Sequence, residues 1–153
     1  MRNSGEIRAV DSLPVGILKY TTIKGRKDSA YIENSEFHKL AAGFLSPEIK
    51  PGQLEKNFSE NAFFDHSTQS SVFNYSNNSE SGFVRRVDVL SKEEAVYSRI
   101  TSIYLEIAGS ATDSFSLKKM MWKPGYHFLI SSVLPDGSAE QIKVVWNTWE
   151  PEQ

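Results

Sequence analysis

The chain has 153 residues, of which 39% are hydrophobic and 24% charged, and this length suits one domain with its own buried core. Its 17 basic and 19 acidic residues leave a net charge of −2, which disfavours a nucleic-acid partner because such proteins usually carry a basic excess. The absence of cysteine excludes disulfides, thiolate zinc sites and cysteine nucleophiles.

Residues 1–14, MRNSGEIRAVDSLP, are polar and predict a flexible arm before a single domain over residues 15–153. The arm lacks the apolar core of a signal peptide, and no run reaches the roughly 20 apolar residues that a membrane helix needs. Two interpretations of the arm stand equally. It is the tether left after removal of a signal or lipid-anchor segment, or it is a simple cytoplasmic start.

Residues 15–23, VGILKYTTI, are rich in β-branched and apolar residues and predict a short strand that the run KGRKD closes. The following run, DSAYIENSEFHKLAAGFLSPEIKPG, predicts an α-helix. Its apolar residues recur with helical spacing as one stripe, namely Phe37, Leu40, Ala41, Phe44 and Leu45. Either Asp28 or Asn34 caps the start, depending on whether SAYIE is already helical, and Pro47 ends the helix.

After the helix, segments of β-branched and aromatic residues alternate with turn-forming stretches such as KPG and PDG. They predict strands over residues 61–67, 71–77, 83–91, 95–107, 114–123, 126–134 and 142–149. Connections this short join antiparallel neighbours, since a parallel crossover needs about a dozen residues. We therefore expect an α+β domain in which an N-terminal helix packs on a curved antiparallel sheet, cystatin-like or, alternatively, a nuclear-transport-factor-2-like cone.

Strand alternation separates the two adjacent lysines of SFSLKKMMWK, because Lys118 and Lys119 point to opposite faces of a strand. Trp122 shares the face of Lys118. It either packs under the helix or stands on an open face as the anchor of an interface. Tyr126, just after the Pro-Gly pair, is a second candidate for contact with a ligand or partner.

Asp65 and His66 in AFFDHS are candidates for a polar group in an apolar pocket, because burial raises a carboxyl pKa towards neutrality. They point to opposite faces of a strand, so only one of them can face inwards. The plainer interpretation makes Asp65 an edge or turn residue. Arg86 shares a face with Asp88, and it either belongs to a cross-strand ion-pair row or anchors an anionic ligand.

The three histidines, His38, His66 and His127, have no metal-ligand spacing, and the chain has no phosphate-binding loop or nucleophile motif. We therefore expect no metal, no cofactor and no catalytic residue. This pattern favours a binding domain over an enzyme.

Several segments together resemble the small exported lipoproteins of Bacteroidetes bacteria, namely DSAYIENSEFHKLAAGFL, RRVDVL, ITSIYLEI and KKMMWKPGYHFLI with VVWN. The resemblance covers about residues 28–147. It implies a periplasmic or outer-membrane location, with the lipid-bearing cysteine removed upstream, and it implies no particular activity. A cytoplasmic location is the alternative.

A non-catalytic envelope domain that binds a protein partner or a small ligand on its sheet is the function that the sequence favours. Its candidate contact residues are Asp65, His66, Arg86, Trp122 and Tyr126. The alternative is a small-ligand carrier or enzyme of the nuclear-transport-factor-2-like class, with Asp65 or His66 in an apolar pocket. The sequence leaves the ligand, the partner and the oligomeric state open.

Overall fold

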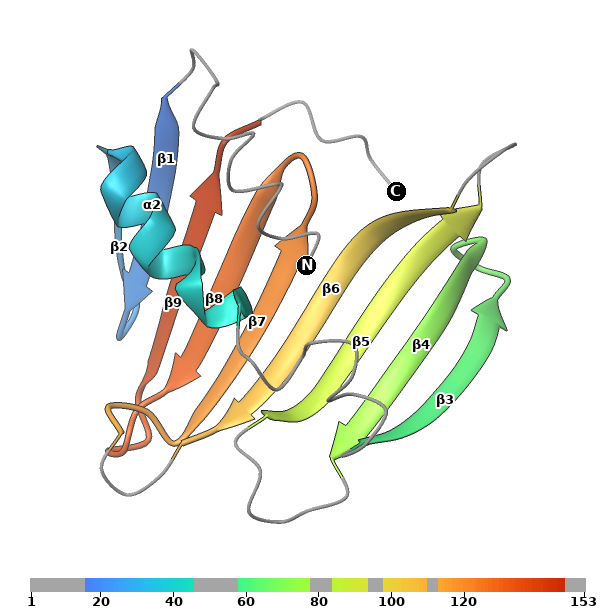
Figure 1. The fold of residues 1–153 in the computed structure, drawn as a ribbon. Coiled ribbons are helices and arrows are strands. Elements are labelled where there is room, and N and C mark those ends of the chain that lie inside the picture. The colour runs from blue at the N-terminus through green and yellow to red at the C-terminus, as the bar shows by residue number, and fades with distance from the viewer. Residues whose placement is uncertain (1–15, 46–57, 78–83, 94–97, 110–112, 148–153) are drawn as a thin grey trace.

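A computed structural model describes residues 16–45, 58–77, 84–93, 98–109 and 113–147. All the described strands belong to one nine-stranded sheet with the order β2-β1-β9-β8-β7-β6-β5-β4-β3 (Figure 1). The elements are β1 (Ile17–Ile23), β2 (Arg26–Ile32), α2 (Asn34–Ala41), the 3₁₀ helix η1 (Ala42–Leu45), β3 (Phe58–Asp65), β4 (Ser70–Asn77), β5 (Val84–Glu93), β6 (Ser98–Ala108), β7 (Leu117–Lys123), β8 (His127–Val133) and β9 (Ala139–Val145).

The sheet combines a meander with one long-range pairing. Strands β3 to β9 each pair with the next strand along the chain, always antiparallel. The last strand, β9, then pairs with β1, and β2 completes the sheet beyond β1. The first and last parts of the described chain therefore lie side by side.

The expected α+β fold is wrong, in its cystatin-like and its nuclear-transport-factor-2-like form alike, because the protein is dominated by its sheet. Helix α2 has only eight residues, and two strands precede it. The residue pattern did not predict β2. Its first residues were assigned to the turn after the first strand, and its last residues to the start of the helix. Lys24 and Gly25 join β1 to β2 with φ values of 50° and 81°, the backbone of a tight hairpin turn.

The strands expected after the helix are all present, as β3 to β9, with ends that differ by a few residues. The helix begins at Asn34, and no side chain caps its first turn, so neither Asp28 nor Asn34 has the expected capping role. The predicted arm at residues 1–14 and the stop at Pro47 lie outside the described residues. Among the residues that are described, no helix is long and apolar enough to cross a membrane.

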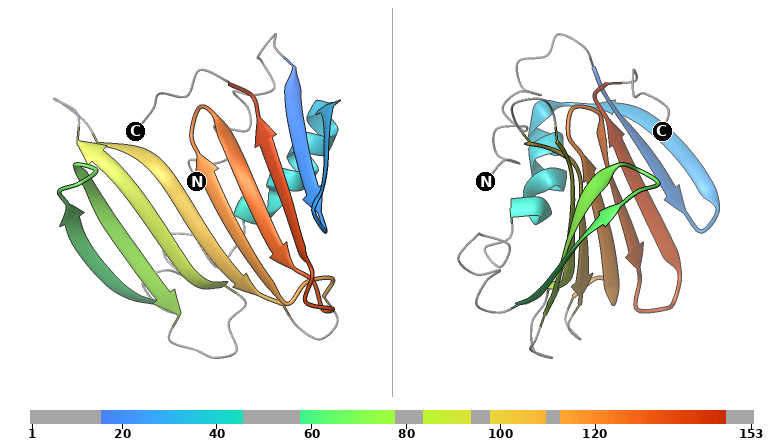
Figure 2. Two further views of the ribbon diagram at one scale, coloured as in Figure 1. Left: turned by 180° about the vertical axis from the view of Figure 1, so that it is seen from behind. Right: turned by 90° about the vertical axis from the view of Figure 1, so that its right-hand side faces the viewer.

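Helix α2 packs against one face of the sheet through its apolar stripe (Figures 1 and 2). Phe37 and Phe44 are fully buried. The ring centre of Phe37 lies 6.3 Å from that of Trp122 and 5.6 Å from that of Phe128. We call Phe37, Phe44, Trp122, Phe128 and Trp146 the aromatic core. Trp122 therefore packs under the helix and is not exposed on the opposite face.

The two faces of the sheet differ in cover. We call the face that contacts α2 the helix face and the opposite one the open face. Among the described residues, no helix or strand lies over the open face (Figure 2). Lys118 lies on the helix face and Lys119 on the open face, as strand alternation predicts.

A β-bulge in β6 changes the alternation that the sequence predicts. Leu90 pairs with Ser102, whereas Ser91 pairs with Ile100, so Thr101 has no partner residue in β5. Ile100 consequently packs against the same core as Ile103. Strict alternation along an unbulged strand would place these two isoleucines on opposite faces.

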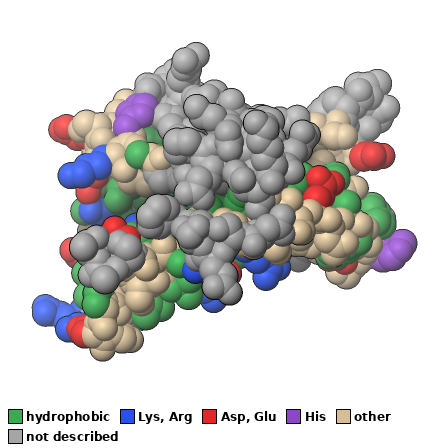
Figure 3. Space-filling view, turned by 60° about the horizontal axis from the view of Figure 1, so that its bottom comes forward, with side chains coloured by type: hydrophobic (Ala, Val, Ile, Leu, Met, Phe, Trp, Pro, Cys, Tyr) green, Lys and Arg blue, Asp and Glu red, His purple; other side chains and the backbone are tan. Residues whose placement is uncertain are grey.

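The two edge strands differ in chemistry. β2 carries three consecutive charged residues, Arg26 to Asp28, which protect an edge from pairing with other strands. β3 instead exposes Phe63 and Phe64, at 51% and 48%. Hydrophobic side chains reach the surface at this end of the molecule, at the right of Figure 3.

Replacing Phe37 with alanine should lower the free energy of unfolding by about 3–5 kcal/mol, because a fully buried ring is lost from the aromatic core. Urea denaturation measures this change. Tyr31→Ala is the control, since this side chain is 77% exposed and its loss should cost less than about 0.5 kcal/mol. Equal effects of the two changes would contradict the packing of α2 on the sheet.

Candidate functional site

The open face of β7, β8 and β9 combines apolar side chains with lysines. We call this set the lysine patch, and it consists of Leu117, Lys119, Met121, Lys123, His127, Leu129, Ser131, Val133, Gln141, Lys143 and Val145. The acidic residue of these three strands, Glu140, lies on the helix face, where it lines a groove beside α2. The side chains of the lysine patch therefore carry only basic charges, and the nearest carboxylate on the same face is that of Glu106 in β6, directly opposite Lys119.

The geometry of the patch follows from strand register. Met121 pairs with Leu129, and Leu129 pairs with Lys143, so the two apolar side chains lie in one row beside a lysine. Leu129 and Met121 are partly exposed, whereas Lys119 and Lys143 are exposed. A groove of about 510 Å³ continues the patch towards the turns at one end of the strands, and its wall includes Thr22, Gln141 and also Glu140. This surface offers apolar contact and positive charge together.

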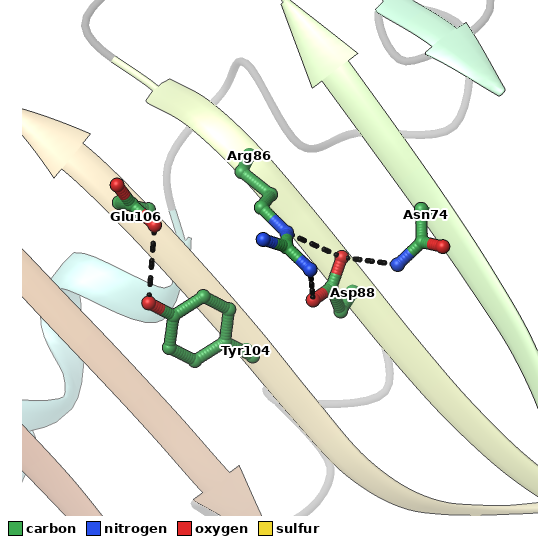
Figure 4. A network of polar contacts seen from close by, with 5 residues as sticks. All are labelled: Asn74, Arg86, Asp88, Tyr104 and Glu106. Atoms are coloured by element: carbon green, nitrogen blue, oxygen red, sulfur yellow. Dashed lines mark hydrogen bonds and ion pairs between the residues drawn. The ribbon is translucent and has the colours of Figure 1, made fainter. Parts of the chain in front are cut away.

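A polar network lies beside the patch, on the open face of β4, β5 and β6 (Figure 4). The Asp88 carboxylate accepts a hydrogen bond from Arg86 Nε at 3.0 Å and forms an ion pair with Arg86 Nη2 at 2.8 Å. Asn74 Nδ2 donates to the same carboxylate at 2.6 Å. Tyr104 donates to Glu106 at 3.1 Å.

The network explains the position of Arg86. Its ion pair is formed with Asp88 of the same strand, whereas the residue pattern predicts either an ion-pair row across strands or contact with an anionic ligand. The guanidinium carbon also lies 6.0 Å from the ring centre of Tyr104, within reach of a cation–π attraction. The hydrogen bond to Asp88 raises the pKa of Arg86, so this side chain stays charged.

Burial raises the pKa of Tyr104 to about 12, and the charge and hydrogen bond of Glu106 add to this effect. The phenol is therefore a hydrogen-bond donor at physiological pH. The open face thus has two parts, the lysine patch and a network in which Arg86 and Asp88 balance each other, and Glu106 of the network lies opposite Lys119 of the patch.

Asp65 and His66 lie at the end of β3, away from both parts. The Asp65 carboxylate accepts hydrogen bonds from the backbone N and the Oγ of Ser67, at 2.9 and 2.6 Å. These bonds lower the pKa of Asp65, whereas a proton carrier in an apolar pocket needs a raised pKa. His66 is exposed and contacts the ring of Phe64 at 5.0 Å between centres. Neither residue lines the groove that continues the lysine patch or the groove beside α2.

Trp122 and Tyr126 have structural surroundings. Trp122 is fully buried, and its Nε1 has no hydrogen-bond partner in the described part of the chain. Tyr126 follows Gly125, whose φ of 87° suits glycine, in the turn between β7 and β8. The backbone oxygen of Tyr126 accepts hydrogen bonds from the backbone N of Trp146 and of Asn147, at 3.0 and 3.2 Å. Tyr126 thus ties the end of β9 to this turn.

A second groove, of about 710 Å³, lies on the helix face beside α2. Its lining includes Leu40 of the helix, Phe115, Lys118 and Met120. Lys118 Nζ lies 4.2 Å from the ring centre of Phe115. Gly109 allows the backbone of Phe115 to approach closely, because a Cβ atom at Gly109 would lie only 2.0 Å from the Phe115 backbone oxygen.

Within the described residues, no group of three or more histidine and acidic side chains could hold a metal ion. Comparison with protein-family models, with curated proteins and with solved structures finds no match to this chain. The resemblance to exported lipoproteins therefore stays a proposal, and the function has to be inferred from geometry and charge.

Tyr104 should ionise near pH 12, against 10.0 for an ordinary tyrosine. The measurement is an absorbance titration at tyrosinate wavelengths, with the curve of Tyr104→Phe subtracted from that of the wild type. Because the folded protein holds this proton more tightly than the unfolded chain, the contribution of Tyr104 to stability falls as pH rises from about 10 to about 12.

Glu106→Gln is the matched variant, and it should lower the pKa of Tyr104 because it removes a nearby negative charge. A difference titration centred at the ordinary value would contradict the position of Tyr104 in the network.

Gly109→Ala should destabilise the protein by about 1–3 kcal/mol, because the added methyl group collides with the backbone that precedes β7. Thermal denaturation measures the change. Ser114→Ala, at an exposed position of the same segment, is the control and should leave the melting temperature nearly unchanged. A Gly109→Ala protein as stable as the wild type would show that this segment can move away.

Proposed function

We propose that the protein is a non-catalytic binding domain of the bacterial envelope that holds an acidic partner protein on its lysine patch. The observation that supports this most directly is the sign of the charge on β7, β8 and β9. The open face of these strands carries Lys119, Lys123 and Lys143, and the carboxylate beside them is that of Glu106, opposite Lys119 in β6.

The chemistry of the patch resembles that of a protein interface. Interfaces combine an apolar centre with a polar rim, and the row of Met121 and Leu129 between lysines provides both. A partner that presents carboxylates around an apolar side chain would match this surface in charge and in character. Such complementarity mainly raises the association rate and selects the partner.

The polar network beside the lysine patch holds its side chains in fixed positions. Arg86, Asp88 and Asn74 hold one another in hydrogen bonds, so the partner meets side chains whose positions are already fixed. Pre-organised side chains lose little conformational entropy when the complex forms. Arg86 keeps half of its side chain exposed, at 51%, and can contact the edge of a partner that sits on the patch.

The envelope location in this proposal rests on the resemblance to exported lipoproteins over about residues 28–147. The catalytic alternative with Asp65 or His66 has less support. The Asp65 carboxyl group is exposed and has a lowered pKa, which does not suit general acid catalysis near neutral pH.

A photo-crosslinking amino acid in place of Gln141, an exposed residue of the patch, tests the proposal in the cells of origin. We expect a discrete adduct with one protein, recovered in the envelope fraction. The adduct should be lost when Lys119→Glu and Lys143→Glu are combined, and kept when both lysines become arginine. The same amino acid at Ala42, exposed next to α2, should give no such adduct.

Three outcomes would count against the proposal. They are the absence of an adduct at position 141, an adduct that survives the charge reversal, and an adduct with phospholipid. The last would assign the lysine patch to a membrane surface.

A further inference from the structure

We infer that the groove beside α2 binds a small amphipathic carboxylate, with Lys118 as the group that holds its charge. This site lies on the helix face, opposite the lysine patch, and is independent of the proposed partner binding. The inference rests on the shape of the groove, on its apolar wall and on the surroundings of one lysine.

The groove has the size and the lining of a small-molecule site. Its volume of about 710 Å³ falls within the range of roughly 300–1,000 Å³ that such sites occupy. Leu40 of α2 forms one wall, and Met120, Ile130 and Ile142 of the sheet form the floor. Phe115 lines the groove near Lys118. An apolar chain or ring would replace water along these side chains.

Lys118 brings a positive charge to this apolar groove. Its ammonium group lies against the ring face of Phe115, at 4.2 Å from the centre. A ring face attracts a cation but accepts no conventional hydrogen bond, so the three N–H donors of the ammonium group remain available to a carboxylate. None of the described ion pairs involves Lys118. Its partial burial lowers its pKa, and the charges of Asp113 and Glu140 offset this effect only in part.

The other charged groups around the groove favour a ligand with one negative charge. Glu36 is held by Lys19 at 2.6 Å, so its charge is already balanced. Asp113 and Glu140 interact electrostatically with Lys118, and Lys39 of α2 also lines the groove. Since these two carboxylates balance the two lysines, a singly charged carboxylate adds less excess negative charge to the groove than a doubly charged phosphate.

Decanoate is a suitable probe, because it joins one carboxylate to an unbranched apolar chain. Isothermal titration of the wild-type protein with decanoate should show saturable binding at one site. Lys118→Met keeps an unbranched apolar stem but removes the charge, and it should weaken binding about tenfold or more, the loss expected for a charge-assisted hydrogen bond. 1-Decanol should bind the wild type more weakly than decanoate by a similar factor.

Lys119→Met is the matched control, because this lysine is the next residue of the same strand and points to the open face. It should bind decanoate as the wild type does. Thermal denaturation of both variants without ligand shows whether each is folded.

The inference would be overturned if the wild type shows no saturable binding below the concentration at which decanoate forms micelles. Equal affinity of the wild type and Lys118→Met would also overturn it. An equal loss in Lys118→Met and Lys119→Met would show that binding depends on total charge and not on the groove. None of these results bears on the adduct at position 141, so the two proposals fail separately.

Discussion

The contact of Phe37 with Trp122, Phe128 and Trp146 determines which face of the sheet is buried. Successive strand residues point to opposite faces. Once α2 packs on one of these rings, the face of every other residue in β7, β8 and β9 follows from this alternation. Lys119, Met121 and Leu129 are left on the uncovered side for this reason. Both proposed binding surfaces therefore depend on the packing of α2, a helix of eight residues, against the sheet.

Residue patterns anticipated the elements that carry a strong apolar period. The stripe through Phe37 and Phe44 and the strands from β3 to β9 belong to this class. β2 was missed because its sequence, RKDSAYI, is polar, as an edge strand can be, and shows no buried alternation. Since this strand was absorbed into the helix, the protein was expected to be α+β instead of sheet-dominated. The bulge at Thr101 arises from pairing with β5, which no local pattern reports.

The candidate site was harder to predict than the individual strands. The residues of the lysine patch come from three strands, and none of them belongs to a recognisable sequence motif. The candidate residues were chosen from the sequence by residue type. Of these, Asp65 and His66 lie at an exposed strand end, and Trp122 lies in the aromatic core. The opposite orientations of Lys118 and Lys119 were predictable from alternation alone. The short connection predicts that β8 and β9 are neighbours, but the sequence could not supply their register, which places Lys143 beside Leu129.

The pairing of β1 with β9 has a consequence for the order in which the chain can fold during synthesis. Strands β3 to β8 find their partners among neighbours that emerge together, whereas β1 cannot join the sheet until Ala139–Val145 has left the ribosome. Trp146 belongs to the aromatic core and follows β9 in the chain. The surface on which α2 packs is therefore also completed late. The face that carries Trp122 and Phe128 is thus shielded late, because α2 can complete its packing on that face only after β9 and Trp146 have been synthesised.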